Sequence, residues 1–319
     1  MELFFAPLEG VTYPEYRLLS ARMFPGIKEY FAPFVSPGSG GFTQDFLRKK
    51  LPDTGSVVRL VPQLMANNPE YFLENAKRIR DLGYDEINLN AGCPFGTVFS
   101  KHKGSGMLLD LESLDSFLYG VFSAADYPVS IKTRMGVEST EEFGKILEIY
   151  NKYPVSRLII HARDRKGMYK SEPDLQGFKS AFYLSKNPVS YNGNIFSEED
   201  LRELKCLVPE LDSVMIGRGA VANPALPRML TGGGALTLKE FAEFHDTLIE
   251  SYLASGYDPG TVSRRMKELW YYMICLFPNS GKAHKNMLKS RTLQEYRAAF
   301  ASLTQTSAFD GSAKFLNIQ

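Results

Sequence analysis

The chain has 319 residues, of which 44% are hydrophobic and 23% are charged, and its formal net charge at pH 7 is +1. This composition excludes a disordered chain and predicts a well-packed protein of one large domain or two. The three cysteines form no CxxC pair and the four histidines have no ligand spacing with them, so we expect neither a disulfide framework nor a metal site. No basic leader opens the chain and no apolar run approaches the ~20 residues of a membrane span, so we expect a cytoplasmic protein without membrane contact.

Eight short β-rich runs alternate with helical patterns along most of the chain. The runs are residues 3–6, 29–32, 57–64, 86–89, 129–133, 157–161, 189–191 and 213–216. Between them, as in residues 69–82, apolar side chains recur at helical spacing. Such alternation implies parallel strands. Eight repeats, with no Gly-x-Gly-x-x-Gly after the first strand, favour a closed (β/α)8 TIM barrel over an open doubly wound α/β sheet.

The alternation stops at the glycine-rich stretch 231–235, and only helical patterns follow it. We expect helices in residues 238–253, 262–277, 282–289 and 293–303. The sequence therefore predicts a barrel domain at residues 1–232, a small all-helical domain at 236–306 and a frayed tail at 307–319.

Polar and cationic residues end several of the predicted strands, where barrel enzymes hold their chemistry. They are Gln63, Asn90, Lys132, Arg134, His161 and Arg163. Cys93 follows shortly after Asn90, between Gly92 and Pro94, and a thiol fixed there could donate or accept a proton. Three of these residues have a plainer explanation. Cys93 could be a buried apolar cysteine, Lys132 could form an internal ion pair, and His161 could be a core histidine.

Glycine turns follow the last two predicted strands, at Asn192-Gly193-Asn194 and Gly217-Arg218-Gly219. Their backbone N–H groups could hold a phosphate, with Arg218 adding charge, although the glycines could equally serve only to make tight turns. Two turns together favour a phosphorylated cofactor. The amide of Gln63 could pair with the pyrimidine edge of a flavin, and Lys132 could stabilise negative charge on a reduced ring.

The order and spacing of these motifs resemble the tRNA-dihydrouridine synthase family along the whole barrel. The matching segments are residues 6–12, 63–65, 88–94, 132–134, 161–163, 192–193 and 217–224. The Cys-Pro element with its Lys and His-x-Arg companions is specific to that family, whereas the glycine turns occur in many flavin barrels.

The resemblance implies an FMN enzyme that uses NADPH or NADH to reduce the C5–C6 double bond of a uridine in tRNA. A hydride would pass from flavin N5 to uracil C6, and Cys93 would protonate C5 with a thiol of ordinary pKa. The cofactor-binding residues implied are Pro7, Leu8, Glu9, Gln63, Lys132, His161, Asn192, Gly193, Asn194, Gly217 and Arg218. The substrate-binding residues implied are Asn90, Lys101, Arg134 and Arg163.

Three positions depart from the family pattern. Leu8 stands where methionine is frequent, Asn194 where aspartate often follows Asn-Gly, and Leu175 where tryptophan is usual. These differences put the identity of the substrate in doubt more than flavin binding.

Basic residues gather where RNA contact would be needed to hold an extruded uridine. Eight lie between residues 262 and 297, against only Glu268 and Glu295: Arg264, Arg265, Lys267, Lys282, Lys285, Lys289, Arg291 and Arg297. A second group near the barrel mouth comprises Lys101, His102, Lys103, Arg163, Arg165, Lys166 and Lys170, with Tyr169 able to stack on a base. We expect tRNA as partner, leave ribosomal RNA open, and expect a monomer. The Trp270-Tyr-Tyr272 run is expected in the helical core.

Two rival functions remain open. The first is a small-molecule flavin oxidoreductase such as a dihydropyrimidine or dihydroorotate dehydrogenase, which would have no need for a separate basic helical domain. The second is a non-catalytic RNA-binding flavoprotein, for which Cys93 would be dispensable.

Overall fold

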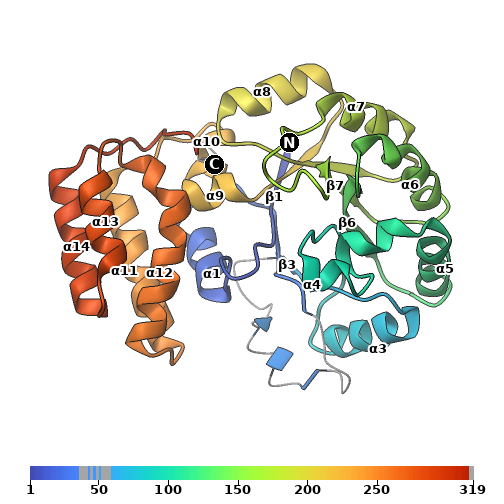
Figure 1. Cartoon of the computed structure of the whole chain (residues 1–319), viewed down its shortest axis with the longest axis horizontal. Helices are drawn as coiled ribbons and strands as arrows, with labels where there is room; N and C mark the ends of the chain where they lie inside the picture. The colour runs from blue at the N-terminus through green and yellow to red at the C-terminus, as the bar shows by residue number, and fades with distance from the viewer. Residues whose placement is uncertain (36–41, 44–45, 48–49, 52–58, 316–319) are drawn as a thin grey trace. The chain divides into compact units, whose positions relative to one another are not determined.

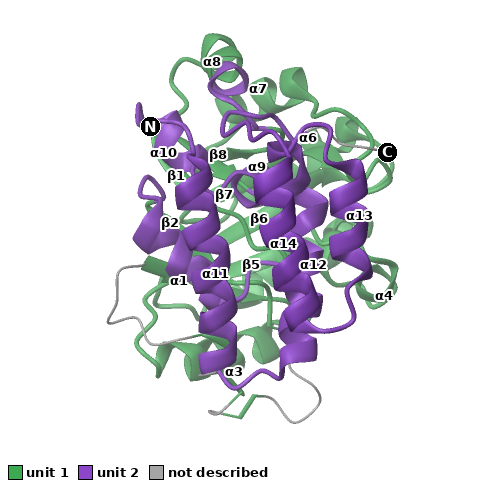
Figure 2. Cartoon of the chain, turned by 90° about the vertical axis from the view of Figure 1, so that its left-hand side faces the viewer, with its two compact units in different colours: residues 1–9, 28–194, 202–216 green, residues 10–27, 195–201, 217–319 purple. Residues whose placement is uncertain are grey.

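The computed structural model describes residues 1–35, 42–43, 46–47, 50–51 and 59–315 (Figure 1). The chain forms two compact units, which Figure 2 shows in different colours. The first unit comprises residues 1–9, 28–194 and 202–216, and the second comprises residues 10–27, 195–201 and the chain from residue 217 onward. These units do not coincide with the predicted domain limits, and the division into a catalytic and an RNA-binding domain stays a prediction.

The first unit is a closed parallel β-barrel, as predicted. Its strands are β1 (Glu2–Phe5), β2 (Glu29–Phe31), β3 (Arg59–Val61), β4 (Gln63–Leu64), β5 (Ile87–Ala91), β6 (Val129–Gly136), β7 (Leu158–Asp164), β8 (Val189–Asn192) and β9 (Ser213–Ile216). Strands β3 and β4 are two parts of one predicted strand, separated by Pro62, which has no N–H to donate. Because β3 pairs with β2 and β4 pairs with β5, the sheet closes on itself. The predicted start of that strand, residues 57–58, lies outside the described residues.

Helices follow the strands and lie outside the sheet (Figure 1). They include α3 (Pro69–Arg80), α5 (Leu111–Phe122), α6 (Phe143–Tyr150) and α7 (Leu175–Leu184), each in contact with the next, while α8 (Glu198–Leu207) follows β8. Local signals start them: Asn68 accepts a hydrogen bond from the Tyr71 N–H at the start of α3, and Asp110 caps α5 in the same way. The short elements α4 (Gly96–Phe99), η1 (Gly104–Leu109) and η2 (Thr140–Glu142) lie in the loops after β5 and β6.

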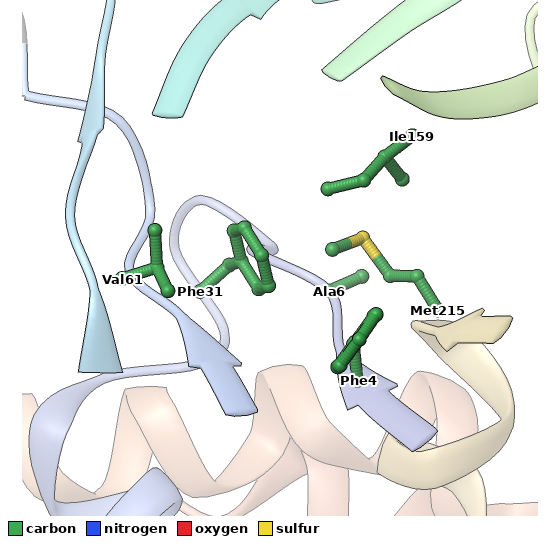
Figure 3. Close-up of a cluster of buried hydrophobic side chains, with 6 residues drawn as sticks. All are labelled: Phe4, Ala6, Phe31, Val61, Ile159 and Met215. Atoms are coloured by element: carbon green, nitrogen blue, oxygen red, sulfur yellow. The ribbon is translucent and has the colours of Figure 1, made fainter. Parts of the chain in front are cut away.

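The barrel interior is filled by apolar side chains from different strands, which point toward one another in Figure 3. They are Phe4, Ala6, Phe31, Val61, Ile159 and Met215. Side chains alternate along a strand, so His161 and Arg163 point to the same side as Ile159 but lie nearer the carboxyl end. The apolar layer therefore supports a polar layer above it.

The second unit is helical. It comprises α1 (Pro14–Met23), α9 (Arg218–Ala222), α10 (Leu226–Leu230), α11 (Leu238–Ala254), α12 (Pro259–Met273), η3 (Ile274–Leu276), α13 (Gly281–Lys289) and α14 (Leu293–Thr306). The buried indole of Trp270 donates a hydrogen bond to the Tyr296 hydroxyl at 2.7 Å, which confirms its predicted place in the core. Tyr271 is 57% exposed, so the prediction for that part of the run is wrong.

The predicted frayed tail is wrong for residues 308–315. The Asp310 N–H donates to the Leu276 carbonyl at 2.9 Å, the Asn223 amide donates to the Gly311 carbonyl at 2.8 Å, and Phe315 is only 5% exposed. These contacts are made within the second unit. Across the described chain, the helices are too short or too polar to cross a bilayer.

Candidate active site

Polar side chains from neighbouring strands point into the barrel at the carboxyl ends. Lys132 pairs with Ile159 in register, and Asn90 pairs with Lys132. Because paired residues of adjacent strands point to the same side, both share the interior with Ile159. The same reasoning places Arg134 and Asn192 in the interior, because both pair with His161. Asn88 shares the face of Asn90 on β5, and Gln63 pairs with Asn88, so these two side chains also point inward.

Three side-chain amides form a buried ladder across β4 and β5. The Gln63 Nε2 donates to the Asn88 Oδ1 at 2.7 Å, and the Asn90 Nδ2 donates to the Gln63 Oε1 at 2.7 Å. The Asn88 Nδ2 in turn donates to the Ser130 hydroxyl at 2.9 Å. Both ends of the Gln63 amide are thus engaged and its orientation is fixed, while its contact with a flavin stays a prediction.

The loop that carries Cys93 is fixed on both sides of the thiol. The Asn90 Oδ1 accepts hydrogen bonds from the Gly92 N–H at 3.1 Å and the Cys93 N–H at 2.9 Å. On the other side, the Cys93 carbonyl accepts from the Ser105 N–H at 3.0 Å and the Ser105 hydroxyl at 2.8 Å. Asn90, predicted to contact the substrate, therefore also positions Cys93.

The surroundings of Cys93 keep its thiol protonated at neutral pH. The residue is 8% exposed, and burial raises the thiol pKa above its usual range. The Phe95 backbone N–H and the positive charges of Arg134 and Lys132 act in the opposite direction and favour the thiolate, though more weakly. A thiol with these neighbours can hold a proton and can also stabilise the anion that its loss leaves behind.

Lys132 is a half-buried cation at the same end of the barrel. Burial, followed by repulsion from Arg134, lowers the pKa of its ammonium to about 7. Within the described residues, no hydrogen bond or ion pair reaches this ammonium. An anionic ligand atom would supply the missing partner, so the site fits the negatively charged edge of a reduced flavin.

Arg134 connects the Cys93 loop to the loop that follows β7. Its Nε donates to the Gly92 carbonyl at 3.0 Å, and its Nη1 donates to the Asp164 carbonyl at 2.7 Å and the Met168 carbonyl at 3.0 Å. The guanidinium also lies 5.5 Å from the centre of the Tyr169 ring. Arg134 is 1% exposed, and these contacts give it a role in holding the two loops, while its predicted substrate contact remains untested.

A polar chain runs outward from His161 through Arg163. The Arg163 Nη1 lies 3.1 Å from the His161 Nε2, and because arginine only donates, this nitrogen accepts and the neutral ring carries its proton on Nδ1. The Arg163 Nη2 donates to the Asn194 Oδ1 at 3.0 Å, and the Asn194 Nδ2 donates to the Glu172 carboxylate at 3.0 Å. Asn194, where the family often has aspartate, thus joins Arg163 to the carboxylate of Glu172 on another loop.

The turn after β8 is shaped by local packing. The Asn192 amide donates to the Met215 carbonyl at 2.9 Å, which ties the ends of β8 and β9 together. At Gly193, a Cβ atom would lie 2.0 Å from the Tyr191 hydroxyl oxygen, so no larger residue fits beside that tyrosine. Packing against Tyr191 therefore accounts for a glycine at this position, and the phosphate contact of Gly193 stays a prediction.

Gly217 and Arg218 follow the last strand and belong to the second unit. Gly217 precedes the five-residue helix α9. The Arg218 guanidinium lies 5.6 Å from the Phe196 ring centre and 5.9 Å from that of Phe315. The predicted contact of these residues with a phosphate remains untested.

Pro7, Leu8 and Glu9 follow β1 directly. The Ala6 N–H donates to the Ile216 carbonyl at 2.8 Å, which fixes the start of this segment. Pro7 and Leu8 are half-buried and Glu9 is exposed. The negative charge of Glu9 slightly raises the pKa of the Cys93 thiol, so this segment lies within electrostatic reach of the site.

Lys101 and Lys103 lie on the loop beyond α4. Lys101 is exposed, and its carbonyl accepts a hydrogen bond from the Asn67 amide at 2.9 Å. The Lys103 ammonium lies 5.5 Å from the Tyr71 ring centre. Both side chains are on the Cys93 loop, where RNA contact is predicted.

The basic residues of the helical unit do not all have the same surroundings. The Arg265 guanidinium lies 3.7 Å from the ring centres of both Tyr13 and Tyr257, and Arg297 forms an ion pair with Glu250 at 2.6 Å. Besides the ion-paired Arg297, the exposed cations of the predicted set are Arg264, Lys282, Lys285, Lys289 and Arg291. The predicted RNA surface is therefore best sought among this exposed set.

Sequence reasoning missed three residues that organise the site. Asn88 lies two residues before Asn90 on the same strand face, so the period-2 spacing could have indicated it. Ser105 and Glu172 come from loops and carry no signal in the sequence, because their partners Cys93 and Asn194 are distant along the chain.

A family model described as "Dihydrouridine synthase (Dus)" matches residues 4–300. The tRNA-dihydrouridine synthase B of Shewanella oneidensis is 29% identical over 262 residues, which are 81% of this chain and 80% of that protein. The tRNA-dihydrouridine(16) synthase of Escherichia coli O157:H7 is 33% identical over 180 residues, and this match spans 56%, about half, of each protein.

The fold also matches solved structures of other proteins. A solved structure of morphinone reductase in complex with tetrahydroNAD has a TM-score of 0.52 at 14% identity and covers 74% of this chain and 88% of that one. At this identity the likeness concerns the barrel fold alone. Since the family model spans residues 4–300 of 319, the chain belongs to the dihydrouridine synthase (Dus) family of enzymes.

Proposed function

We propose that this protein reduces the C5–C6 double bond of a uridine in tRNA to dihydrouridine, with bound FMN and with NADPH or NADH as reductant. The observation that carries the proposal is the pairing of two groups at one end of the barrel. A buried, protonated Cys93 thiol lies within electrostatic reach of the Lys132 ammonium, which has no counter-ion in the described structure. Membership of the Dus family supports the same conclusion.

FMN fits the donor set at the barrel mouth. Lys132 offers a cation to the anionic edge of the ring, and we assign His161, on the neighbouring strand, to the same ring. When bound, FMN supplies the hydride for uracil C6 after its own reduction by NADPH or NADH. The proposed phosphate contacts are the two glycine turns, at Asn192-Gly193 and Gly217-Arg218.

Cys93 supplies the proton that completes the reduction. The thiol S–H bond breaks as the C5–H bond of the product forms, and a thiolate remains on Cys93. The Phe95 N–H, Arg134 and Lys132 stabilise that thiolate, and solvent restores its proton before the next turnover. Asn90 and Ser105 hold the loop so that the sulfur stays in one position throughout.

The names of the relatives give tRNA as substrate but no single uridine position. The name of the Escherichia coli relative gives position 16, but that match covers only 56% of either chain. The departures at Leu8, Asn194 and Leu175 give further reason to test other uridines, including those of ribosomal RNA.

The test is a dihydrouridine map of tRNA and ribosomal RNA from the host. The gene is left intact, deleted, or restored as wild type or Cys93→Ala. Loss at defined uridines that only the wild type restores would support the proposal and identify the substrate. An unchanged map, in a host with no second enzyme for the same uridines, would favour small pyrimidines as substrates instead.

A further inference from the structure

Phe95 is an exposed aromatic residue on the loop that holds Cys93. It follows the thiol by two residues, and 56% of it is exposed. In the part of the chain that the structure describes, no other ring or cation contacts the Phe95 ring. A ligand that covers this ring would remove apolar surface from water and so gain binding energy.

The backbone of Phe95 is fixed relative to Cys93. Its carbonyl accepts hydrogen bonds from the Val98 N–H at 3.0 Å and the Phe99 N–H at 2.9 Å, which start helix α4. Its own N–H is directed at the Cys93 sulfur. A rigid aromatic side chain loses little conformational entropy on binding, so it is suited to act as a platform.

The charge around Phe95 indicates the kind of partner. Residues 91–109 include Lys101, His102 and Lys103 but no aspartate or glutamate. On the neighbouring loop, the Arg165 guanidinium lies 3.7 Å from the Phe99 ring centre. A cationic loop that exposes an apolar ring matches a nucleobase attached to a phosphate backbone.

We propose that Phe95 stacks on the base next to the uridine that is reduced, and so holds the strand while the uridine lies at Cys93. This inference rests on the proposed function. Extruding a uridine leaves its neighbour without a stacking partner on one side, and an aromatic ring near the proton donor can replace it. Phe95 is then a residue of RNA positioning and not of proton transfer.

The test uses the full-length protein with its flavin and compares Phe95→Ala and Phe95→Trp with the wild type. Tyr119→Ala is the matched control, because Tyr119 is 68% exposed and belongs to α5, outside the Cys93 loop. Phe95→Ala should raise the KM for substrate RNA about 5- to 150-fold, the range found for loss of one base-stacking contact. Its kcat at saturating RNA, its flavin content and its NADPH oxidation should stay near wild type. Phe95→Trp should keep the wild-type KM.

A second readout detects the stack directly. Substrate RNA with 2-aminopurine next to the target uridine should lose fluorescence on binding the wild type and Tyr119→Ala, and should keep it with Phe95→Ala. Wild-type KM and quenching in Phe95→Ala would overturn the inference and leave the proposed function intact. A wild-type protein that reduces no RNA would overturn both.

Discussion

Replacing Lys132 with methionine should stabilise the flavin-free protein, although it removes a residue of the proposed site. The ammonium is half-buried, and the described structure contains no anion paired with it. Methionine keeps most of the length and the apolar stem of lysine but carries no charge. The substitution therefore removes an unfavourable burial of charge without opening a large cavity.

The magnitude follows from the lowered pKa of Lys132. A fall in the folded state from 10.5 to about 7 corresponds to about 5 kcal/mol at about 1.4 kcal/mol per unit. Because the side chain keeps some contact with water, we expect about half of this, about 2.5 kcal/mol. Below pH 7 Lys132 is charged in both the folded and the unfolded chain, so the destabilisation is complete. Between pH 7 and 10.5 the folded chain has lost this proton and the unfolded chain still holds it, so the destabilisation decreases and disappears near pH 10.5.

Urea unfolding of flavin-free protein at pH 6.5 and pH 9 measures this effect. Lys132→Met should exceed the wild type in unfolding free energy, and the difference should shrink by about 1 kcal/mol between the two pH values. Lys145→Met, at an exposed position on α6, is the control and should show no such trend. With flavin present, Lys132→Met should bind it more weakly. The reasoning would be refuted if Lys132→Met were less stable than the wild type, or if its gain in unfolding free energy were the same at both pH values.

Three further predictions concern single contacts. Asn90→Ala leaves the N–H groups of Gly92 and Cys93 without their acceptor, so it should lower the unfolding free energy by about 2 kcal/mol in urea titrations. Gly104 has φ +56° and a Cβ there would lie 2.8 Å from the Cys93 carbonyl oxygen, so Gly104→Ala should slow single-turnover RNA reduction at least about tenfold, unlike Gly96→Ala. Burial lowers the pKa of His245, so thermal stability should fall as pH drops below about 6.5, and His245→Gln should show a smaller fall in a Tm series from pH 7.5 to 5.

The barrel was predictable because its signal is local. Each strand carries a short apolar run and each helix its own periodicity, so all eight strands could be located, including the one that Pro62 divides. The association of α1 with the C-terminal helices could not be predicted, since it depends on contacts between segments more than 200 residues apart, such as that of the Tyr16 hydroxyl with the Ala220 carbonyl.

The places of the predicted site residues at the strand ends were predictable, but their hydrogen bonds were not. Lys132 and Cys93 were indicated by their chemistry at strand ends. Arg134 and Arg163 are each 1% exposed and donate to the loop carbonyls of Gly92 and Ser171, contacts that the sequence did not indicate, while their substrate contacts stay predictions. Loop conformation decides such bonds, and neither spacing nor residue type encodes it.

The central claim is that Cys93 donates the proton to C5, and a single-turnover experiment tests it most directly. Enzyme reduced beforehand with NADPH is mixed with substrate RNA, and flavin reoxidation is followed for the wild type and Cys93→Ala. We predict that Cys93→Ala accepts electrons from NADPH at the wild-type rate but reduces RNA about 100-fold or more slowly. Reoxidation by RNA at the wild-type rate in Cys93→Ala would contradict the claim.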